Sequence, residues 1–438
     1  MGKKFADVRD SFWFLPAVMA FGAAVLAVIT VAVDEEVNTS SIEGDFVYAG
    51  GPEGARTLLG TIAASMIGVA GVSFSITVAS LTLASGQFGP RILRNFTRDR
   101  GNQVVLGTFI AGFIDCLLVL RTVRGTDGDD FVPYISVTVG LVLALAGLAV
   151  LIYFIHHVST SIQATSIVAA IGREFDHAVE RMFPGTIGAE PPPDAELEGV
   201  AEDVDREGAE IPARKDGYVQ GIDLQRLLSI AIRDDLVIRM RHRPGHFVSK
   251  GTALASVVPK ASVSAATIQR LQSAVFVGDH RTPDQDVEFS VDQLVEIAVR
   301  ALSPGVNDPF TAMACLERLG AGLRRLAVVQ IPSPYRHDDS GRLRVIAWPV
   351  DFEGVFDAAL NQIRQYGAES AAVAIRMLEV IAGVAEVAEE PDRRRALLRH
   401  AVMIERGSRQ AIKEELDLQA IEERYRAVVA TLSETEPV

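Results

Sequence analysis

The sequence predicts an α-helical membrane protein with four transmembrane helices and a cytoplasmic α+β domain, which contains a small β-barrel-like module and a helical bundle. Three observations predict this class. All long apolar segments fall within the first 157 residues, short β-branched runs alternate with turns between residues 210 and 258, and helical periodicity dominates from residue 267. With 438 residues and a net charge of −14, the chain is long enough for a membrane part and a large soluble part.

Four apolar segments are long enough to cross a bilayer. A hydrocarbon core of about 30 Å requires roughly 20 residues of helix. Residues 12–33, 57–84, 104–120 and 134–155 meet or nearly meet that length, the third being the shortest. The first follows Lys3, Lys4 and Arg9, but it exceeds the roughly 7–15 apolar residues of a secretory signal. We therefore expect it to be the first membrane helix.

Charged residues in the connecting loops predict the topology. The N-terminus is basic, the loop of residues 34–56 is acidic, and the loop of residues 85–103 contains Arg91, Arg94, Arg98 and Arg100. Short basic segments stay on the cytoplasmic side. The pattern predicts a multi-pass protein of the bacterial inner membrane with both termini cytoplasmic, and the four arginines are expected to contact anionic lipid.

The second apolar segment is rich in hydroxyl groups. At helical spacing Ser73, Thr77 and Ser80 share one face, and Thr61 and Ser65 belong to a neighbouring face that continues through residues 68, 75, 79 and 82. Such residues let helices pack closely. They could instead line a hydrated path, because small polar side chains leave room for water and solvate ions. Both interpretations stay open here.

The third apolar segment contains an acidic residue, Asp115. A carboxylate at membrane depth costs a few kcal/mol on insertion scales, so a functional role is the default expectation. Two structural alternatives remain. Asp115 could be protonated and hydrogen-bonded to a hydroxyl of the second segment, or it could lie near the interface.

The soluble part divides by composition into three regions after the membrane domain of residues 1–158. Residues 159–210 are expected to form a helical extension and an acidic, Pro-rich linker, residues 211–260 the β module, and residues 261–438 a mainly helical domain. Glycine-punctuated phrases around Gly217 and Gly245 resemble the two halves of a biotinyl/lipoyl-type barrel. The lysine that such a fold modifies is missing, so no attached cofactor is expected.

One polar cluster in the helical region is a candidate site for an ion or small ligand. Its members are Arg281, Gln285, Asp286, Asn307 and Asp308. The alternative is helix capping. Asp308 precedes Pro309 in the pattern of an N-cap followed by proline at the first helical position.

Several function classes are not supported by the sequence. No concentrated basic surface suits nucleic acid. Cys116 and Cys315 form neither a disulfide framework nor a metal-binding pattern. The chain has no nucleophile elbow, Walker loop, zinc helix motif or dinucleotide fingerprint. We expect no enzyme activity, no cofactor and no resident metal.

Three long motifs carry a family resemblance: SFWFLP, FSITVASLTLASGQFGPRIL and RTPDQDVEFSVDQLVEIAVRALSPGVNDPFTA. Together with the four apolar segments, they resemble the predicted bacterial membrane protein family with domain of unknown function 2254. The resemblance implies four membrane helices and a cytoplasmic domain. It implies no activity and no catalytic residue.

The function that the sequence favours is a homo-oligomeric ion channel or pore, gated by its cytoplasmic domain. Its partners would be the lipid bilayer, further copies of the chain and a small ion or ligand. The alternatives are a membrane-anchored sensor or scaffold without transport, and a proton-coupled transporter that uses Asp115. An enzyme acting on lipids is the least supported class, because no catalytic constellation accompanies it.

Overall fold

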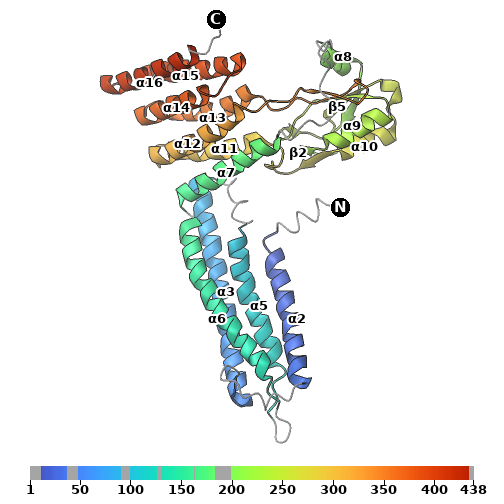
Figure 1. Cartoon of the computed structure of the whole chain (residues 1–438), viewed down its shortest axis with the longest axis vertical. Helices are drawn as coiled ribbons and strands as arrows, with labels where there is room; N and C mark the ends of the chain where they lie inside the picture. Colours follow the sequence, from blue (N-terminus) through green and yellow to red (C-terminus); the bar gives the residue numbers. More distant parts are fainter. Residues whose placement is uncertain are drawn as a thin grey trace. The chain divides into compact units, whose positions relative to one another are not determined.

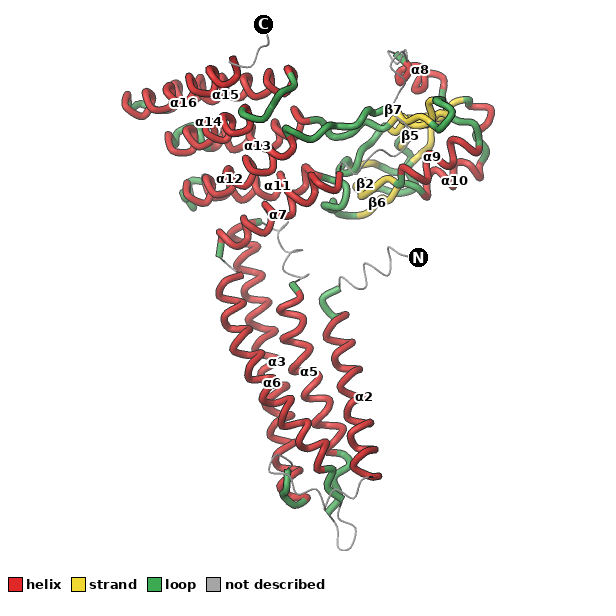
Figure 2. Tube along the Cα trace, viewed as in Figure 1, coloured by secondary structure: helices red, strands yellow, loops and turns green. Residues whose placement is uncertain are grey.

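The computed structural model describes residues 11–36, 48–89, 99–125, 131–161, 163–182 and 199–433. The chain divides into two compact units, Met1–Ser166 and Ile167–Val438. The first unit consists of long helices, and the strands of both sheets belong to the second unit (Figures 1 and 2).

Four helices in the described part of the first unit are long and apolar enough to cross a membrane. They are α2 (Phe14–Glu36), α3 (Pro52–Phe88), α5 (Arg100–Leu120) and α6 (Tyr134–Ser161). These helices confirm the four apolar segments predicted from the sequence. Helices α3 and α6 continue beyond the apolar runs, to Phe88 and Ser161.

Helix α5 is the central helix of this unit, since its contacts with α2, α3 and α6 are more extensive than those of the other three helices with one another. Met66 of α3 packs against Gly112 of α5 and Gly147 of α6, and a methyl group added to Gly147 would lie 2.7 Å from Cε of Met66. The interior around Met66 is filled by apolar side chains such as Leu59 and Phe109. These contacts place Met66, Gly112 and Gly147 at the same height along α3, α5 and α6.

Helix α3 extends further than its neighbours at one end. From Met66 to Phe88 it runs for about 33 Å, whereas α5 runs for only about 18 Å from Gly112 to Arg100. Helix α3 therefore continues for about 15 Å past the first residue of α5. We call the end of the first unit where α3 projects the His157 end, after a residue of α6. The opposite end is called the Asp34 end, after a residue of α2.

The strands of the second unit form two sheets. The order in the larger sheet is β1-β5-β3-β8-β7, and in the smaller sheet it is β4-β2-β6. Only β3 and β8 pair in parallel among the described strands. The strands are β1 (Ala209–Pro212), β2 (Gly217–Ile222), β3 (Val237–Met240), β4 (Phe247–Val248), β5 (Ala253–Val258), β6 (Val275–Gly278), β7 (Tyr335–His337) and β8 (Leu343–Ile346).

The prediction of a β-barrel-like module in residues 211–260 is wrong, because the described strands close no barrel. Helix α9 (Leu224–Arg233) interrupts the region: its side chains at Leu227 and Ile230 are buried, and Asp223 caps it by accepting from the Arg226 amide at 3.0 Å. The sheets also recruit β6, β7 and β8 from beyond residue 260. The short helices η3 (Lys260–Ser262) and α10 (Ala265–Ser273) connect β5 to β6.

Helices form the rest of the second unit. Helices α11, α13 and α15 contact one another in succession, as do α12, α14 and α16, so that helix pairs stack on each other (Figure 1). The helices are α7 (Ala164–Met182), α8 (Val200–Glu207), α11 (Val287–Ala301), α12 (Pro309–Leu326), α13 (Phe352–Tyr366), α14 (Ala371–Ala385), α15 (Pro391–Ala411) and α16 (Glu415–Ser433). The predicted helical character of this region is confirmed.

Helix α7 contacts α12, and the two helices run in the same direction. The ring of Phe175 is fully buried against Gly322, where an added methyl group would lie 2.1 Å from the ring. The next residue, Asp176, pairs at 2.5 Å with Arg325, which lies about one turn beyond Gly322. Because residue numbers increase together along the two helices, the N-terminal ends of α7 and α12 lie at the same end of the pair.

Candidate functional site

Helix α3 presents a continuous stripe of mostly small and hydroxyl-bearing residues on the exposed side of the first unit. We call it the hydroxyl stripe. Its members recur every three or four residues and all are exposed: Thr57, Thr61, Ser65, Gly68, Val72, Ser75, Ala79 and Thr82. The stripe faces away from the packed interior around Met66.

Each hydroxyl of the stripe donates to the carbonyl one turn earlier. Thr61 donates to the Thr57 carbonyl and Ser65 to the Thr61 carbonyl, both at 2.7 Å. Ser75 and Thr82 make the same bond at 2.8 and 2.9 Å. A hydroxyl that donates its hydrogen keeps lone pairs that can accept. The hydroxyl oxygens of the stripe can therefore act as acceptors.

The structure separates the hydroxyl residues singled out in the sequence. Thr61 and Ser65 lie on the exposed stripe, close to the level of Met66. Ser73 is buried at 3% exposure, and Thr77 and Ser80 are half-buried. The two faces distinguished by helical spacing therefore differ in burial. The face of Thr61 and Ser65 is exposed, and the face of Ser73 is turned toward the rest of the first unit.

Asp115 of α5 is fully buried, at 0% exposure. Neither of its carboxylate oxygens has a hydrogen-bond partner among the described residues. The carboxylate lies against Gly140 of α6, where an added methyl group would be 3.9 Å from Oδ2. The hydroxyl partner considered for a protonated Asp115 is therefore not found in the described part of the chain. A buried polar group without a partner is costly and needs an explanation.

At the Asp34 end, one carboxylate joins the first and last membrane helices. Asp34 accepts from the backbone amides of Ile135 and Ser136 at 2.9 Å each, and from the Ser136 hydroxyl at 2.7 Å. It therefore caps the N-terminus of α6 from the far end of α2. The sequence interpretation missed this role, because Asp34 was counted only as loop charge.

At the His157 end, Asp99 caps α5 and also binds α6. Its Oδ1 accepts from the Gly101 amide at 2.8 Å, and its Oδ2 lies 2.6 Å from Nε2 of His157. The ring of Tyr153 stacks on the imidazole, with ring centroids 5.3 Å apart. Of the predicted lipid-binding arginines, Arg100 begins α5, and Arg91, Arg94 and Arg98 lie outside the described residues.

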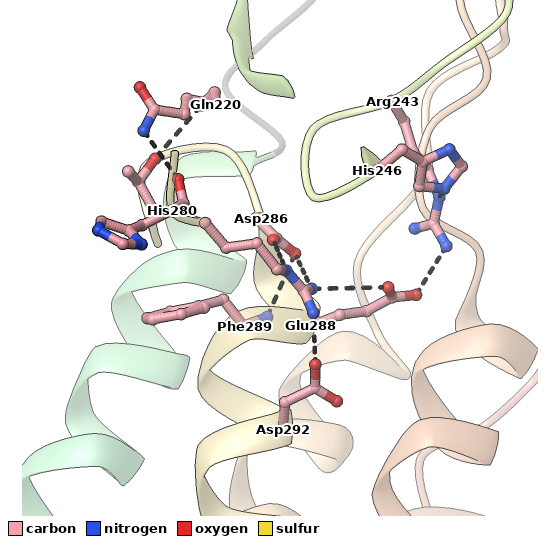
Figure 3. Close-up of polar contacts among 10 residues, drawn as sticks. Gln220, Arg243, His246, His280, Asp286, Glu288, Phe289 and Asp292 are labelled. Carbon is pink, nitrogen blue, oxygen red and sulfur yellow. Dashed lines mark hydrogen bonds and ion pairs between the residues drawn. The ribbon is translucent and has the colours of Figure 1, made fainter. Parts of the chain in front are cut away.

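In the second unit, Arg281 lies within 4.0 Å of three carboxylates. These are Asp286, Glu288 and Asp292, which Figure 3 labels. The Arg281 guanidinium donates twice to Asp286, at 2.7 and 2.9 Å, and once to Asp292. Burial alone would lower the pKa of Arg281, but the carboxylates of Asp286 and Asp292 outweigh it, and the pKa is raised. Asp286 also accepts from the Phe289 amide and so caps α11.

The cluster connects the turn between β3 and β4 to helix α11. Arg243 of that turn donates to Glu288 at 2.8 Å, and its Nε donates to Nε2 of His246 at 3.0 Å. Burial, followed by the charge of Arg243, lowers the pKa of His246. Gly245 has φ +94°, and an added methyl group would lie 2.6 Å from Asp286. Arg243, Glu288 and Asp292 were missed in the sequence, since their pairing depends on this turn.

The other predicted members of the polar site lie elsewhere. Gln285 bonds the backbone of Ile222 at the end of β2, accepting at 2.8 Å and donating at 3.3 Å. Asp308 caps α12, accepting from the amide and hydroxyl of Thr311, and these bonds lower its pKa. Asn307 is exposed in the preceding turn. The 15 residues of α11, about 22 Å long, separate Asp286 from Asn307 and Asp308.

No group of three or more metal-binding side chains occurs within the described ranges of the chain. Cys116 and Cys315 are free and buried.

Comparison with known proteins identifies the family. A family model described as "Predicted membrane protein (DUF2254)" matches residues 9–383. The chain belongs to this family. The resemblance expected from the three sequence motifs is confirmed, and with it the assignment as a membrane protein.

Curated relatives from mycobacteria are similar over almost the whole chain. "Uncharacterized protein Mb1321c" of Mycobacterium bovis and "Uncharacterized protein Rv1290c" of Mycobacterium tuberculosis are each 31% identical over 420 residues, covering 94% of this chain and 78% of the relative. No solved structure matches the chain. The family membership therefore brings the membrane assignment but no activity.

Proposed function

We propose that this protein is a homo-oligomeric pore of the bacterial inner membrane that conducts cations and is gated by its second unit. The observation that carries the proposal is the hydroxyl stripe of α3, which is exposed along the length of a membrane helix. In an oligomer, stripes contributed by several copies would surround a common axis.

The packing of the first unit argues for several copies rather than one. Its interior is filled by apolar side chains around the central helix α5, including Leu59, Met66 and Phe109. A hydrated path through such a core would need water in contact with apolar groups on every side. The polar surface lies outside, on α3, so a path formed by one chain alone is disfavoured.

The chemistry of the stripe favours cations. The hydroxyl hydrogens of Thr61 and Ser65 are held by backbone carbonyls, which leaves oxygen lone pairs directed outward. Oxygen acceptors can replace part of the hydration shell of a cation. Since the described stripe carries no formal charge, ions would be solvated without being held tightly.

Helix α7 supports gating by the second unit. It follows α6 after a short connection, and it is held on α12 by Phe175 and by the Asp176–Arg325 ion pair. A movement of the second unit would therefore be transmitted to the last membrane helix. The loop charges favour cytoplasmic termini, and we assign no enzyme activity, cofactor or metal.

Ion flux from reconstituted vesicles tests the pore. Replacing Ser65 with Leu should block flux at least about tenfold, since a bulky side chain would project from each copy into a narrow path. Ser159→Leu is the matched control, because Ser159 is an exposed α6 serine that makes the same backbone bond, at 2.7 Å. Absence of flux in the unmodified protein, or equal flux in both variants, would contradict the proposal.

Proton-coupled transport is the second candidate, and the unpartnered carboxylate of Asp115 favours it. An intramembrane acid without a fixed partner is able to bind and release a proton during transport. Asp115→Asn should then abolish uptake driven by a pH gradient. In the pore, the same variant should leave flux driven by an ion gradient nearly unchanged, because Asp115 does not lie on the stripe.

A third possibility, a sensor or scaffold without transport, predicts no flux under either gradient.

A further inference from the structure

The turn between α11 and α12 presents two large apolar side chains to solvent. Val306 is 59% exposed, and Phe310, in the first turn of α12, is 77% exposed, the highest value for a large apolar side chain among the described residues. Pro304 and Gly305 beside Val306 are also exposed. We call residues 303–310 the apolar turn. Single exposed apolar side chains are common on protein surfaces, so the position of these two in the molecule carries the argument.

The apolar turn is held in a fixed shape. The Val306 and Asn307 amides donate to the Ser303 carbonyl at 3.0 and 2.9 Å, and the Asp308 amide donates to the Ala301 carbonyl at 2.7 Å. The Asp308 carboxylate is occupied by Thr311. These bonds close the turn with the Val306 side chain exposed.

The parallel packing of α7 and α12 indicates which end of the second unit carries this turn. Gly172 lies against Arg318, and Phe175 lies against Gly322. Extending this register toward the N-terminus of both helices brings Ala164, the first residue of α7, level with Phe310. The apolar turn is thus at the end where the chain enters the second unit.

The covalent chain limits how far this end can be from the last membrane helix. Ala164 follows Ser161, the last residue of the membrane helix α6, by three residues. Three residues span at most about 11 Å. This bound holds whatever the arrangement of the two units.

We propose that the apolar turn inserts Val306 and Phe310 into the interfacial region of the lipid bilayer. The partner is the boundary between headgroups and acyl chains, where aromatic and aliphatic side chains are stable. The turn has no basic side chain, and its one acidic group is engaged in the α12 cap. Insertion therefore depends on apolar contact and not on lipid charge.

Lipid-restricted quenching tests the proposal on the full chain in nanodiscs. Val306→Cys and Val328→Cys would be labelled with a small environment-sensitive fluorophore. Val328 is the matched control, because it is 63% exposed and lies just beyond the opposite end of α12. The native thiols Cys116 and Cys315 are fully buried, and an unsubstituted sample corrects for residual labelling.

We expect spin-labelled phosphatidylcholine to quench the label at position 306 at least about threefold more than the label at position 328, with iodide showing the reverse preference. Quenching should be the same in pure phosphatidylcholine and after addition of phosphatidylglycerol. Phe310→Ser should weaken it, since one of the two inserted groups is lost. Both labelled sites are exposed, so retention on gel filtration checks folding.

Two outcomes would overturn the proposal. Equal iodide quenching at both positions, with no effect of spin-labelled lipid, would leave the turn in water. Cross-linking of position 306 between two copies, again without lipid quenching, would make a second copy the partner. Neither outcome depends on whether the protein conducts ions.

Discussion

Nε2 of His157 lies 2.6 Å from Oδ2 of Asp99, and this single contact joins the end of the last membrane helix to the start of the third. Because Asp99 also caps α5, one side chain supports two helices. The Asp99–His157 contact thus links α5 to α6 at one end of the first unit, and the Asp34–Ser136 hydrogen bond links α2 to α6 at the other end.

Asp99→Ala should reduce the stability of the first unit by about 1–3 kcal/mol, because it removes both an N-cap and a charge-assisted hydrogen bond. Thermal unfolding in lipid nanodiscs measures the effect. His156→Ala is the control, since His156 is exposed beside His157, and it should shift the melting temperature little. Equal shifts for the two variants would show that the pair contributes no stability.

Gly322→Ala should displace α7 from α12. The added methyl group would lie 2.1 Å from the buried ring of Phe175, so the ring must move, at a cost of about 1–3 kcal/mol. Chemical denaturation of the full chain checks this. Gly407→Ala on α15 is the matched control: nothing lies within 4 Å of its added methyl, and alanine should stabilise that helix by about 0.5–1 kcal/mol.

A double-mutant cycle tests whether Arg281 and Asp308 act together. Arg281→Met should destabilise the second unit by about 2–4 kcal/mol, since it removes the guanidinium that binds Asp286 and Asp292. Asp308→Ala should cost about 1 kcal/mol through the lost cap. With α11 between the two sites, the effects should add to within about 0.5 kcal/mol. A larger coupling energy would favour one joint polar site.

His400 should make the stability of the second unit sensitive to mild acid. It is fully buried beside Phe356, and Nε2 lies 2.6 Å from Oδ1 of Asp357. Burial lowers the pKa of His400 below its ordinary value of 6.5; Asp357 opposes this shift, and Arg399 and Arg364 add to it. The unfolded chain therefore binds the proton first. Stability contributed by neutral His400 is present above pH 6.5 and is lost as the pH falls through the lower folded pKa.

Denaturation midpoints between pH 7 and pH 5 measure this dependence. His400→Gln should remove part of the dependence of the denaturation midpoint on pH. His177→Gln is the control, because His177 is exposed. The loss will be partial, because burial also lowers the pKa values of His242, His246 and His337. An unchanged pH profile in the His400→Gln variant would exclude His400 as a contributor.

Features that depend on neighbouring residues were predictable from the sequence. The four membrane helices follow from the length of their apolar runs, and the cap at Asp308 with Pro309 follows from local backbone chemistry. Pairings between segments that lie far apart in the sequence were not predictable in this way. Asp34 meets Ser136, and β8 joins β3, across about a hundred residues, so no local pattern encodes them. The barrel prediction failed because α9 and the distant strands compete with local strand pairing.

The hydroxyl residues show the same division within one helix. Helical spacing correctly grouped Thr61 with Ser65, and Ser73 with Thr77. It could not decide which group is exposed, because that depends on how α3 packs on α5 and α6. Helix packing buries Ser73 and leaves Ser65 open.

The length of α3 has a consequence for access to the hydroxyl stripe. Since this helix continues about 15 Å past the start of α5, the end of the stripe near Thr82 is not covered by α5. Thr82 lies on this projecting part, whereas Thr61 lies close to the level of Met66. A blocker or a regulatory segment could therefore engage the stripe at Thr82 without displacing α5.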